Sequence, residues 1–419
     1  MLLKTILNSV EKHPLFVYGT PKMITNDGEK RIEIPISPRK GSKATCSSCH
    51  KPAPGYDKQP TRKFSFIPLW GFLCFFLYAP RRVQCSDCGV KVEEMPWANG
   101  KSDQTKSYAW FLADWAKILN WKEVGVHFKT TWYHVFTAVK MAVEWGRERM
   151  DIDNITAIGV DEVKWKRGVF VTLVYQIDNG CKRLLWVKEY RTKYALRTFF
   201  NWLQKERSHR IKFVCSDMWK PYLTVIKERA VNAINILDRY HVSAKMNEAI
   251  DKVRAQETKK ARASAPKGTE LVLTNSRWCL LKNKDNLTRK QGVKLRELLQ
   301  VNLQTIRAYL LKEEFHHFWE YKSPTWARKF LKNWCNKTMK SKIEPMKKMA
   351  KMIRRHEDLL MNWFEVRGAI SLGSVEGLNN KLKASVRKSY GFRTFDALQI
   401  ALYHRLGKLP EPERTHRYF

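Results

Sequence analysis

The sequence predicts an α/β protein in which helices flank one mixed sheet, with additional modules before the sheet and inside it. Three observations support this prediction. Two C-x2-C pairs lie near the N-terminus, hairpin-linked strands begin near residue 155, and a long stretch without a strand pattern follows residue 238. At 419 residues, of which 44% are hydrophobic, the chain is long enough for two or three domains with cores of their own.

The charge points to a polyanionic partner. The chain has 78 Lys and Arg residues against 40 Asp and Glu residues, a formal net charge of +38. Such an excess attracts nucleic acid and releases its counterions on binding. An anionic membrane surface is the alternative, but it would need an amphipathic anchor or a membrane span. The apolar stretch 64–79 is shorter than the roughly 20 residues of a span. We therefore expect a buried hairpin there and no membrane partner.

The cysteines predict one structural zinc ion. Two C-x2-C pairs can supply the four thiolates of a tetrahedral site, and they consist of Cys46, Cys49, Cys85 and Cys88. The segments 63–70 and 72–78 between the pairs have strand patterns that could bring the pairs together. His50 could replace a thiolate, although a solvated neighbour is the simpler interpretation. Four ordinary reduced thiols are the alternative. The odd total of nine cysteines indicates a reducing compartment, and the N-terminus lacks an export signal.

Three helices are predicted after Pro96, over residues 107–119, 121–128 and 130–145. A short break before the third helix is typical of a helix-turn-helix, whose last helix enters the major groove of DNA. The leading edge of that helix would carry the DNA-binding residues Lys129, Thr131, Trp132 and His134. A plain helical linker with core aromatics explains the same pattern.

From residue 155 the pattern becomes that of strands. The segment 155–163 is apolar on both faces, as in a covered central strand, and is too apolar for an unpaired charge at Asp161. Hairpin turns then lead to two further strands, over 169–177 and 183–189. A helix, a strand ending at Asp217, a helix and a strand ending at Asp238 follow, over residues 194–206, 211–216, 222–230 and 233–237. This order of elements is that of a ribonuclease H-like fold.

The next region is rich in Lys, Arg and Trp and has helical periodicity over residues 241–257, 288–312 and 346–366. We expect a helical insertion whose basic faces clamp a DNA backbone. Ordinary solvated charged faces are the alternative.

A final helix is predicted between Ser374, a suitable N-cap, and Gly391, a suitable stop. Glu376 lies in its first turn. The steps of four, three and four residues that follow place three phosphate donors on the same helix face, and these are Asn380, Lys383 and Arg387. A metal-binding acid would then be backed by groups that bind phosphate. A surface helix with a stripe of mixed charge is the alternative.

The whole chain resembles the insertion-sequence transposases of the ISL-three family, a branch of the DDE transposases. The four cysteines, the stretches 158–162, 215–218 and 374–380, and Asp238-Arg-Tyr-His241-Val carry this resemblance. Lys383, seven residues after Glu376, matches an E-x6-K element, whereas Leu372 replaces the Arg that often precedes the Glu by four residues. Asp238 and His241 resemble a D-x2-H pair that supports the site in related transposases. A structural pair at a strand end is the alternative.

The resemblance implies metal-dependent strand cleavage and strand transfer at the terminal inverted repeats of the chain's own insertion sequence. Asp161, Asp217 and Glu376 would hold two Mg²⁺ or Mn²⁺ ions, with Asp217 bridging both. Strand alternation points Glu162 to the opposite face from Asp161. The supporting residues would be Asp238, His241, Asn380, Lys383 and Arg387. The partners would be double-stranded DNA, as transposon ends and target, and further copies of the chain in a dimer or larger assembly. A bacterial cytoplasmic location at the nucleoid follows.

These patterns divide the chain into five parts. We expect a zinc module over 1–98, a helix-turn-helix over 99–150, a first core part over 151–257, a helical insertion over 258–366 and a last core part over 367–419. Two other functions fit the same residues. One is a DNA-binding regulator with an inactive nuclease-like domain, and the other is a structure-specific nuclease or RNA-processing enzyme.

Overall fold

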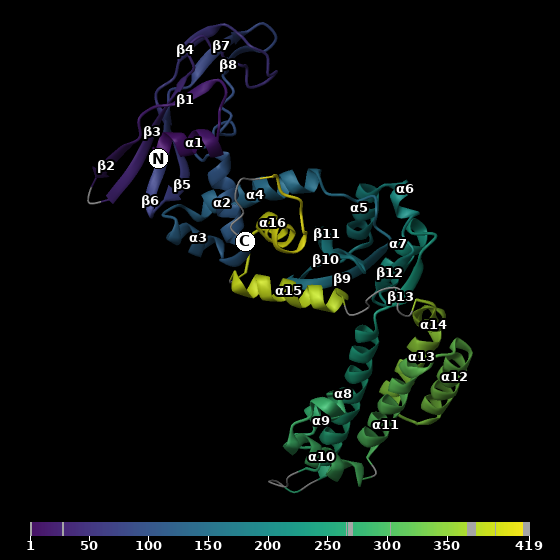
Figure 1. Cartoon of the computed structure of the whole chain (residues 1–419). Helices are drawn as coiled ribbons and strands as arrows, with labels where there is room; N and C mark the ends of the chain where they lie inside the picture. The colour runs from purple at the N-terminus through teal and green to yellow at the C-terminus, as the bar shows by residue number, and fades with distance from the viewer. Residues whose placement is uncertain are drawn as a thin grey trace. The chain divides into compact units, whose positions relative to one another are not determined.

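The computed structural model describes residues 2–26, 29–264, 266, 271–301, 303–366, 374–389 and 391–413. The chain forms two compact units, the first made of Met1–Met150 with Leu382–Phe419 and the second of Asp151–Lys381. Figure 1 labels the helices and strands of both units. Within the described ranges, no helix has the length and apolarity that a membrane crossing requires.

The first unit starts with helix α1 (Leu3–Val10) and a five-stranded sheet. Its strands are β1 (Phe16–Tyr18), β2 (Lys22–Asn26), β3 (Glu29–Pro38), β5 (Arg62–Leu69) and β6 (Phe72–Tyr78). The predicted apolar hairpin is confirmed, because β5 and β6 pair antiparallel with Arg62 opposite Tyr78. Its tip, Trp70-Gly71, has positive φ at both residues, which a tight turn between strands requires. The fully buried Trp97 closes the core, with its ring edge-on to Phe16 and Tyr78.

A second, three-stranded sheet carries the cysteine pairs, and its strands are β4 (Gly55–Lys58), β7 (Arg81–Cys85) and β8 (Gly89–Val92). The β7–β8 turn holds the second pair. Gly89, directly after Cys88, has a φ of +71°, a backbone conformation that favours glycine.

The three predicted helices of this unit are confirmed as α2 (Lys106–Ile118), α3 (Trp121–His127) and α4 (Trp132–Glu148). Each begins at a side-chain cap, made by Thr105, Asn120 and Thr131. The break between α3 and α4 turns at Lys129, which has a φ of +50°. Helix α16 (Phe395–Leu406) packs against α4 and completes the unit.

The second unit is built on a mixed sheet with the strand order β11-β10-β9-β12-β13. The five strands lie where the sequence predicts them, as β9 (Ala157–Lys166), β10 (Val169–Asp178), β11 (Cys181–Glu189), β12 (Phe213–Ser216) and β13 (Ile234–Leu237). The first three form antiparallel hairpins, and β12 runs parallel to both β9 and β13. Strand β9 is central and its residues from Ala157 to Asp161 are all buried, so Asp161 faces the interior of the unit.

Helices connect and cover these strands. They are α5 (Lys193–Leu203), α6 (Lys205–Ser208) and α7 (Lys220–Arg229). Helix α5 packs against β10, β11 and α7. Its inward residues Leu196, Phe199, Phe200 and Leu203 are fully buried or nearly so, following the 3.6-residue period that predicts the helix.

The region after β13 is helical, as predicted. Its elements are α8 (Arg239–Ser264), α9 (Arg277–Leu281), η1 (Lys284–Asn286), α10 (Arg289–Leu299), α11 (Gln304–His316), η2 (His317–Glu320), α12 (Pro324–Lys340), α13 (Glu344–Arg355) and α14 (Glu357–Glu365). Figure 1 shows α8 leaving the sheet as one long helix, with α11 and α13 beside it and α12 packed against α13. Helix α14 packs against β13 and returns the chain to the sheet.

Two predicted helices of this region are wrong in their extent. The segment 288–312 is divided into α10 and α11, and 346–366 is divided into α13 and α14, while α12 has no counterpart in the prediction. The first break has a tertiary cause. The Glu257 carboxylate on α8 accepts hydrogen bonds from the backbone N–H groups of Gln304 and Thr305, both at 2.9 Å, and so caps the start of α11. Sequence periodicity cannot show a cap from a distant helix.

Candidate active site

Asp161 lies on the central strand β9 and is 6% exposed. One carboxylate oxygen accepts a hydrogen bond from the Glu162 N–H at 2.7 Å, and the other accepts one from the side-chain amide of Asn379. Burial raises the pKa of Asp161, although the nearby His241 and these hydrogen bonds act in the opposite direction. A buried carboxylate held in this way gains stability from a neighbouring cation.

Asp217 directly follows β12, and the strand register places it beside Asp161 of β9. Strands β12 and β9 are parallel with Cys215 opposite Gly159, so two further residues along each strand bring the two acids together. The first Asp217 oxygen accepts a hydrogen bond from the Trp219 N–H at 3.0 Å, and the second pairs with Arg191 at 2.8 Å. Asp217 is 8% exposed, so its charge is partly shielded from water.

Arg191 is a site residue that the sequence does not indicate. The nitrogen that contacts Asp217 also lies 3.0 Å from a Glu162 oxygen, and the guanidinium group lies over the Trp219 ring. Burial and the Asp217 charge raise the pKa of Glu162 to about 7, while Arg191 lowers it. Glu162 thus contacts Arg191, whereas Asp161 contacts Asn379, which agrees with the alternation expected along β9. Arg191 nevertheless links Glu162 to Asp217.

The pair Asp238 and His241 lies at the same edge of the sheet. Asp238 ends β13 and is 7% exposed, and its carboxylate lies 3.2 Å from His241 Nδ1. The other ring nitrogen, Nε2, is 3.7 Å from an Asp161 oxygen. Burial lowers the pKa of His241, but the hydrogen bond to Asp238 and the charges of Asp161 and Asp217 outweigh it and raise the pKa to about 9. His241 therefore joins two acids that come from different strands.

Glu376 is positioned by helix α15 (Ser374–Lys388). The first turn of this helix lies directly on β9, because a Cβ added to Gly159 would come within 2.3 Å of a Val375 methyl group. One turn later, Asn379 contacts Asp161 and accepts a hydrogen bond from the Tyr175 hydroxyl at 2.8 Å. Glu376 itself is exposed and, together with Asp238, lines a cavity of about 870 Å³.

The predicted phosphate donors on α15 differ from the buried Asn379 in their surroundings. Asn380, Lys383 and Arg387 are all exposed, and the residue of this helix that contacts an acid of the site is Asn379. The division between the two units falls within α15, after Lys381, so that Lys383 and Arg387 belong to the first unit. Asn379 is part of the stretch that carries the family resemblance, but a single sequence gives no reason to prefer it to Asn380.

The three acids do not yet form a tight cluster. In the part of the chain that the structure describes, the four cysteines are the only group of three or more His, Cys, Asp or Glu side chains whose ligand atoms lie within 4.8 Å of one another. Two divalent ions would have to draw Asp161, Asp217 and Glu376 closer together. The donors themselves suit this task, since carboxylate oxygens are the ligands that Mg²⁺ and Mn²⁺ prefer.

The cysteine cluster fits zinc. Its four Sγ atoms lie within 4.8 Å of one another, and Cys49 Sγ is 3.5 Å from Cys85 Sγ. Tetrahedral ligands at about 2.3 Å from zinc are about 3.8 Å apart, so the cluster has the right size. Backbone N–H groups lower the pKa of Cys46 to about 7, which favours the thiolate that binds metal. His50 lies outside the cluster and pairs with Glu94 at 2.9 Å.

The four predicted DNA-binding residues lie at the start of α4. Lys129 is in the turn before the helix, Thr131 caps it by accepting the His134 N–H at 3.2 Å, and Trp132 is 59% exposed. The His134 ring contacts Thr130 at 2.9 Å and Asp103 at 3.5 Å, so it is already engaged within the unit. Lys129, Thr131 and Trp132 are exposed.

Comparisons with known proteins find related sequences over most of the chain. The family model for DDE transposases of the ISL-three type, described as a transposase, matches residues 158–402, which include Asp161, Asp217 and Glu376. The chain is 27% identical over 378 residues to the transposase for insertion sequence element IS1001 of Bordetella parapertussis, with 87% of this chain and 92% of that protein covered. It is 28% identical over 423 residues to the transposase for insertion sequence element IS1557 of Mycobacterium tuberculosis, covering 93% and 91%.

Proposed function

Because the chain belongs to the ISL-three family of DDE transposases, we propose that it cuts DNA at the ends of its own insertion sequence and joins the cut ends to a target. One observation carries the proposal. Asp161, Asp217 and the Asp238–His241 pair come from three neighbouring strands and meet at one edge of a sheet, where α15 also begins.

The strand order of the sheet in the second unit supports the proposal. Three antiparallel strands followed by two parallel ones, connected by helices, are consistent with a ribonuclease H-like core. In this interpretation residues 151–257 and 367–419 provide the core and residues 258–366 are a helical insertion. The zinc module over 1–98 and a helix-turn-helix over 99–150 would bind the DNA ends, and the exposed residues Lys129, Thr131 and Trp132 would lie at the edge of the helix that enters the major groove.

Two divalent ions would be held by Asp161, Asp217 and Glu376. When bound, such ions activate the attacking water or 3′-hydroxyl and stabilise the leaving oxygen. The surrounding residues prepare the acids for this role. Asn379 fixes one Asp161 oxygen, while the Trp219 N–H and Arg191 each fix one Asp217 oxygen. His241 is positively charged at neutral pH, since its pKa is about 9, and compensates the buried acids before the ions bind.

The partner is double-stranded DNA, both as transposon end and as target. Cutting and joining two ends requires two active sites, so we propose that at least two copies of the chain assemble on the paired ends.

The experiment that tests this function is a cleavage assay on a duplex carrying the inverted repeat that flanks the coding region. We expect Mg²⁺-dependent cleavage by the natural chain, and none by Asp161→Asn or Asp217→Asn, whose affinity for the duplex is unchanged. Asp153→Asn is the matched control, because the Asp153 side chain is 60% exposed and pairs with Arg207 at 2.6 Å. Normal cleavage by Asp217→Asn would overturn the proposal, and a chain that binds the repeat without cutting it would be a regulator.

A further inference from the structure

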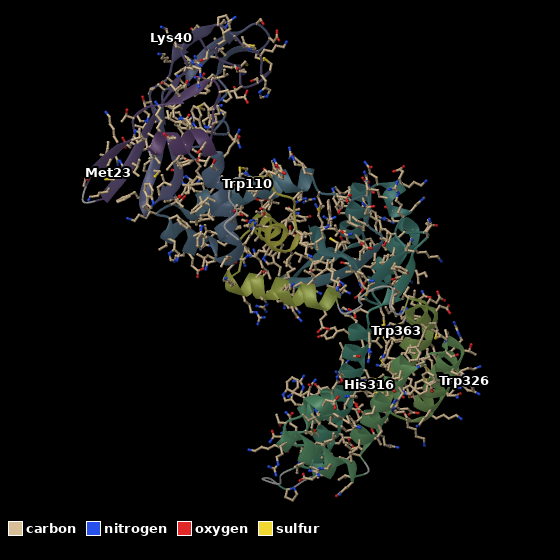
Figure 2. All side chains as sticks on the ribbon, in the orientation of Figure 1. Met23, Lys40, Trp110, His316, Trp326 and Trp363 are labelled. Atoms are coloured by element: carbon tan, nitrogen blue, oxygen red, sulfur yellow. The ribbon has the colours of Figure 1, made fainter. Side chains whose placement is uncertain are left out.

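A cavity of about 870 Å³ connects the candidate active site to the helical region. Asp238 and Glu376 lie at its active-site end, and its remaining walls come from the start of α8, the α9–η1 segment, the end of α11 and α14. Figure 2 labels two lining residues, His316 and Trp363, at the part of the helical region near β13. All the lining residues belong to the second unit.

The walls of this cavity carry positive charge close to the acids. Arg239, Lys282 and Lys312 line it, and Lys312 is only 1% exposed. The Lys312 ammonium group donates a hydrogen bond to the Leu280 carbonyl at 2.9 Å and lies 3.4 Å from a Glu313 oxygen. Lys282 is half-buried and donates to Gln291 at 3.3 Å. These cations suit the phosphates of a nucleic acid strand.

The cavity also contains groups that suit a nucleobase. The Asn247 side-chain oxygen is buried and has no hydrogen-bond partner among the described residues, which is a costly arrangement unless a ligand donates to it. Asn283 and Asn286 line the opposite wall with further amide groups. The Tyr240 ring is 54% exposed and adjacent to Asp238, where a base could stack on it.

The volume of the cavity indicates the size of the ligand that it can hold. Pockets of roughly 300–1,000 Å³ hold small organic molecules, and the cavity falls in this range, so it has room for a single nucleotide. We propose that the cavity receives one unpaired nucleotide of the DNA strand next to the phosphate that is cut. Its phosphate meets Lys282 and Arg239, and its base meets Asn247 and Tyr240. This inference rests on the proposed function, since the acids at the cavity end are the ones assigned to cleavage.

The test compares two duplexes that carry the element's own end. One is fully paired, and the other has its last three nucleotides unpaired at the cleavage site. We expect Asp161→Asn, which binds without cutting, to prefer the unpaired end by at least about fivefold, because one stacked base contributes roughly 1–3 kcal/mol. Adding Tyr240→Leu and Asn247→Leu to this chain reduces the preference to less than about twofold, because the two substitutions remove the ring on which the base stacks and the amide oxygen that meets it. Tyr240 is more than half exposed, so its replacement leaves the packing of α8 largely intact.

Two controls make the result specific. Lys332→Met, at an exposed position on α12, removes a positive charge outside the cavity and should leave the preference intact. Thermal unfolding of each variant shows whether it folds. Equal affinity for both duplexes, or a preference that survives the double substitution in a folded chain, would overturn the inference. So would competition by free deoxynucleoside monophosphate without any preference for the unpaired end, since that assigns the cavity to a free nucleotide. Because binding is measured without cleavage, these outcomes are distinct from a failure of the proposed function.

Discussion

Single side chains fix the orientation of the carboxylates in the candidate site. Asn379 donates to Asp161 and accepts from Tyr175, so its orientation is fixed from both ends. Its amide nitrogen must face the acid, because an ionised carboxylate only accepts hydrogen bonds, and the amide oxygen then accepts from the Tyr175 hydroxyl. Groups that hold a metal ligand in this way affect metal affinity without touching the metal.

We therefore expect Asn379→Leu to lower the rate of DNA cleavage by about 10–100-fold, the usual effect of losing such a partner. Because Asn379 acts through Asp161, the Mg²⁺ concentration required for half-maximal cleavage should also rise. A cleavage titration with Mg²⁺ measures both effects. Asn201→Leu, an exposed position on α5, is the matched control. An unchanged Mg²⁺ requirement in the Asn379 variant would show that this contact has no role in positioning Asp161.

The limits of sequence prediction are clear from these residues. Asp161 and Asp217 could be predicted because each acid stands inside or directly after an apolar strand, a local signal. The contact between Asn379 and Asp161 joins residues 218 positions apart, and nothing in the sequence marks it. Arg191 lies in a polar turn after β11 and is one of many basic residues in the chain. Only the folded arrangement places it between Glu162 and Asp217.

At the scale of elements, the approach of α15 to β9 depends on a glycine. Gly159 has no Cβ, and the space that a Cβ would need is occupied by a Val375 methyl group at 2.3 Å. Strand β9 and the helix that carries Glu376 can therefore touch. The hairpins around β9 follow from local turn signals, whereas the partner of Gly159 lies far along the chain and is not predictable from its neighbours.

Gly159→Ala should separate α15 from β9 and lower the stability of the chain by about 1–3 kcal/mol, as overpacking usually does. DNA cleavage should decrease with it, because Glu376 and Asn379 move away from Asp161. Adding Val375→Ala makes room for the new methyl group, so the double variant should recover cleavage. Unfolding curves and cleavage rates test this pair. A single variant as stable and active as the natural chain would contradict the close contact.

The β4–β7–β8 module is a second element whose stability depends on one feature. Its core of buried residues consists of Ala44, Cys46, Val83 and Cys85, with Cys49, Ala53 and Cys88 packed against them. Such a small core needs additional stabilisation, which metal binding provides.

We expect one zinc ion per chain by metal analysis, and none in Cys85→Ser combined with Cys88→Ser. Loss of the ion should unfold this module at a lower temperature, since the free energy of metal binding contributes to folding. Cys181→Ser is the control, because Cys181 lies on β11 outside the cluster. A double variant that retains zinc and its melting temperature would exclude a four-cysteine site.

At the scale of the molecule, a chain with a net charge of +38 buries a few of its 40 acidic residues. Asp161, Asp217 and Asp238 are all among the buried charged residues, while most of the Lys and Arg side chains are available at the surface. In the proposed function, the basic surface would bind the DNA backbone without regard to sequence, and the acids would bring divalent ions to one phosphate. The net charge alone predicts a nucleic acid partner, and the strand order predicts where in the sheet the candidate active site lies.

The central claim is that Asp161, Asp217 and Glu376 together carry out strand transfer. The role of Glu376 most needs a test, because Glu376 is exposed and lies on helix α15, whereas the two other acids come from strands. The most direct measurement supplies a duplex end with a free 3′-hydroxyl, a supercoiled plasmid and Mg²⁺, and follows the joined product. We predict joining by the natural chain and by the control Glu206→Gln, an exposed acid on α6, and none by Glu376→Gln despite normal DNA binding. Joining by Glu376→Gln at the natural rate would contradict this account.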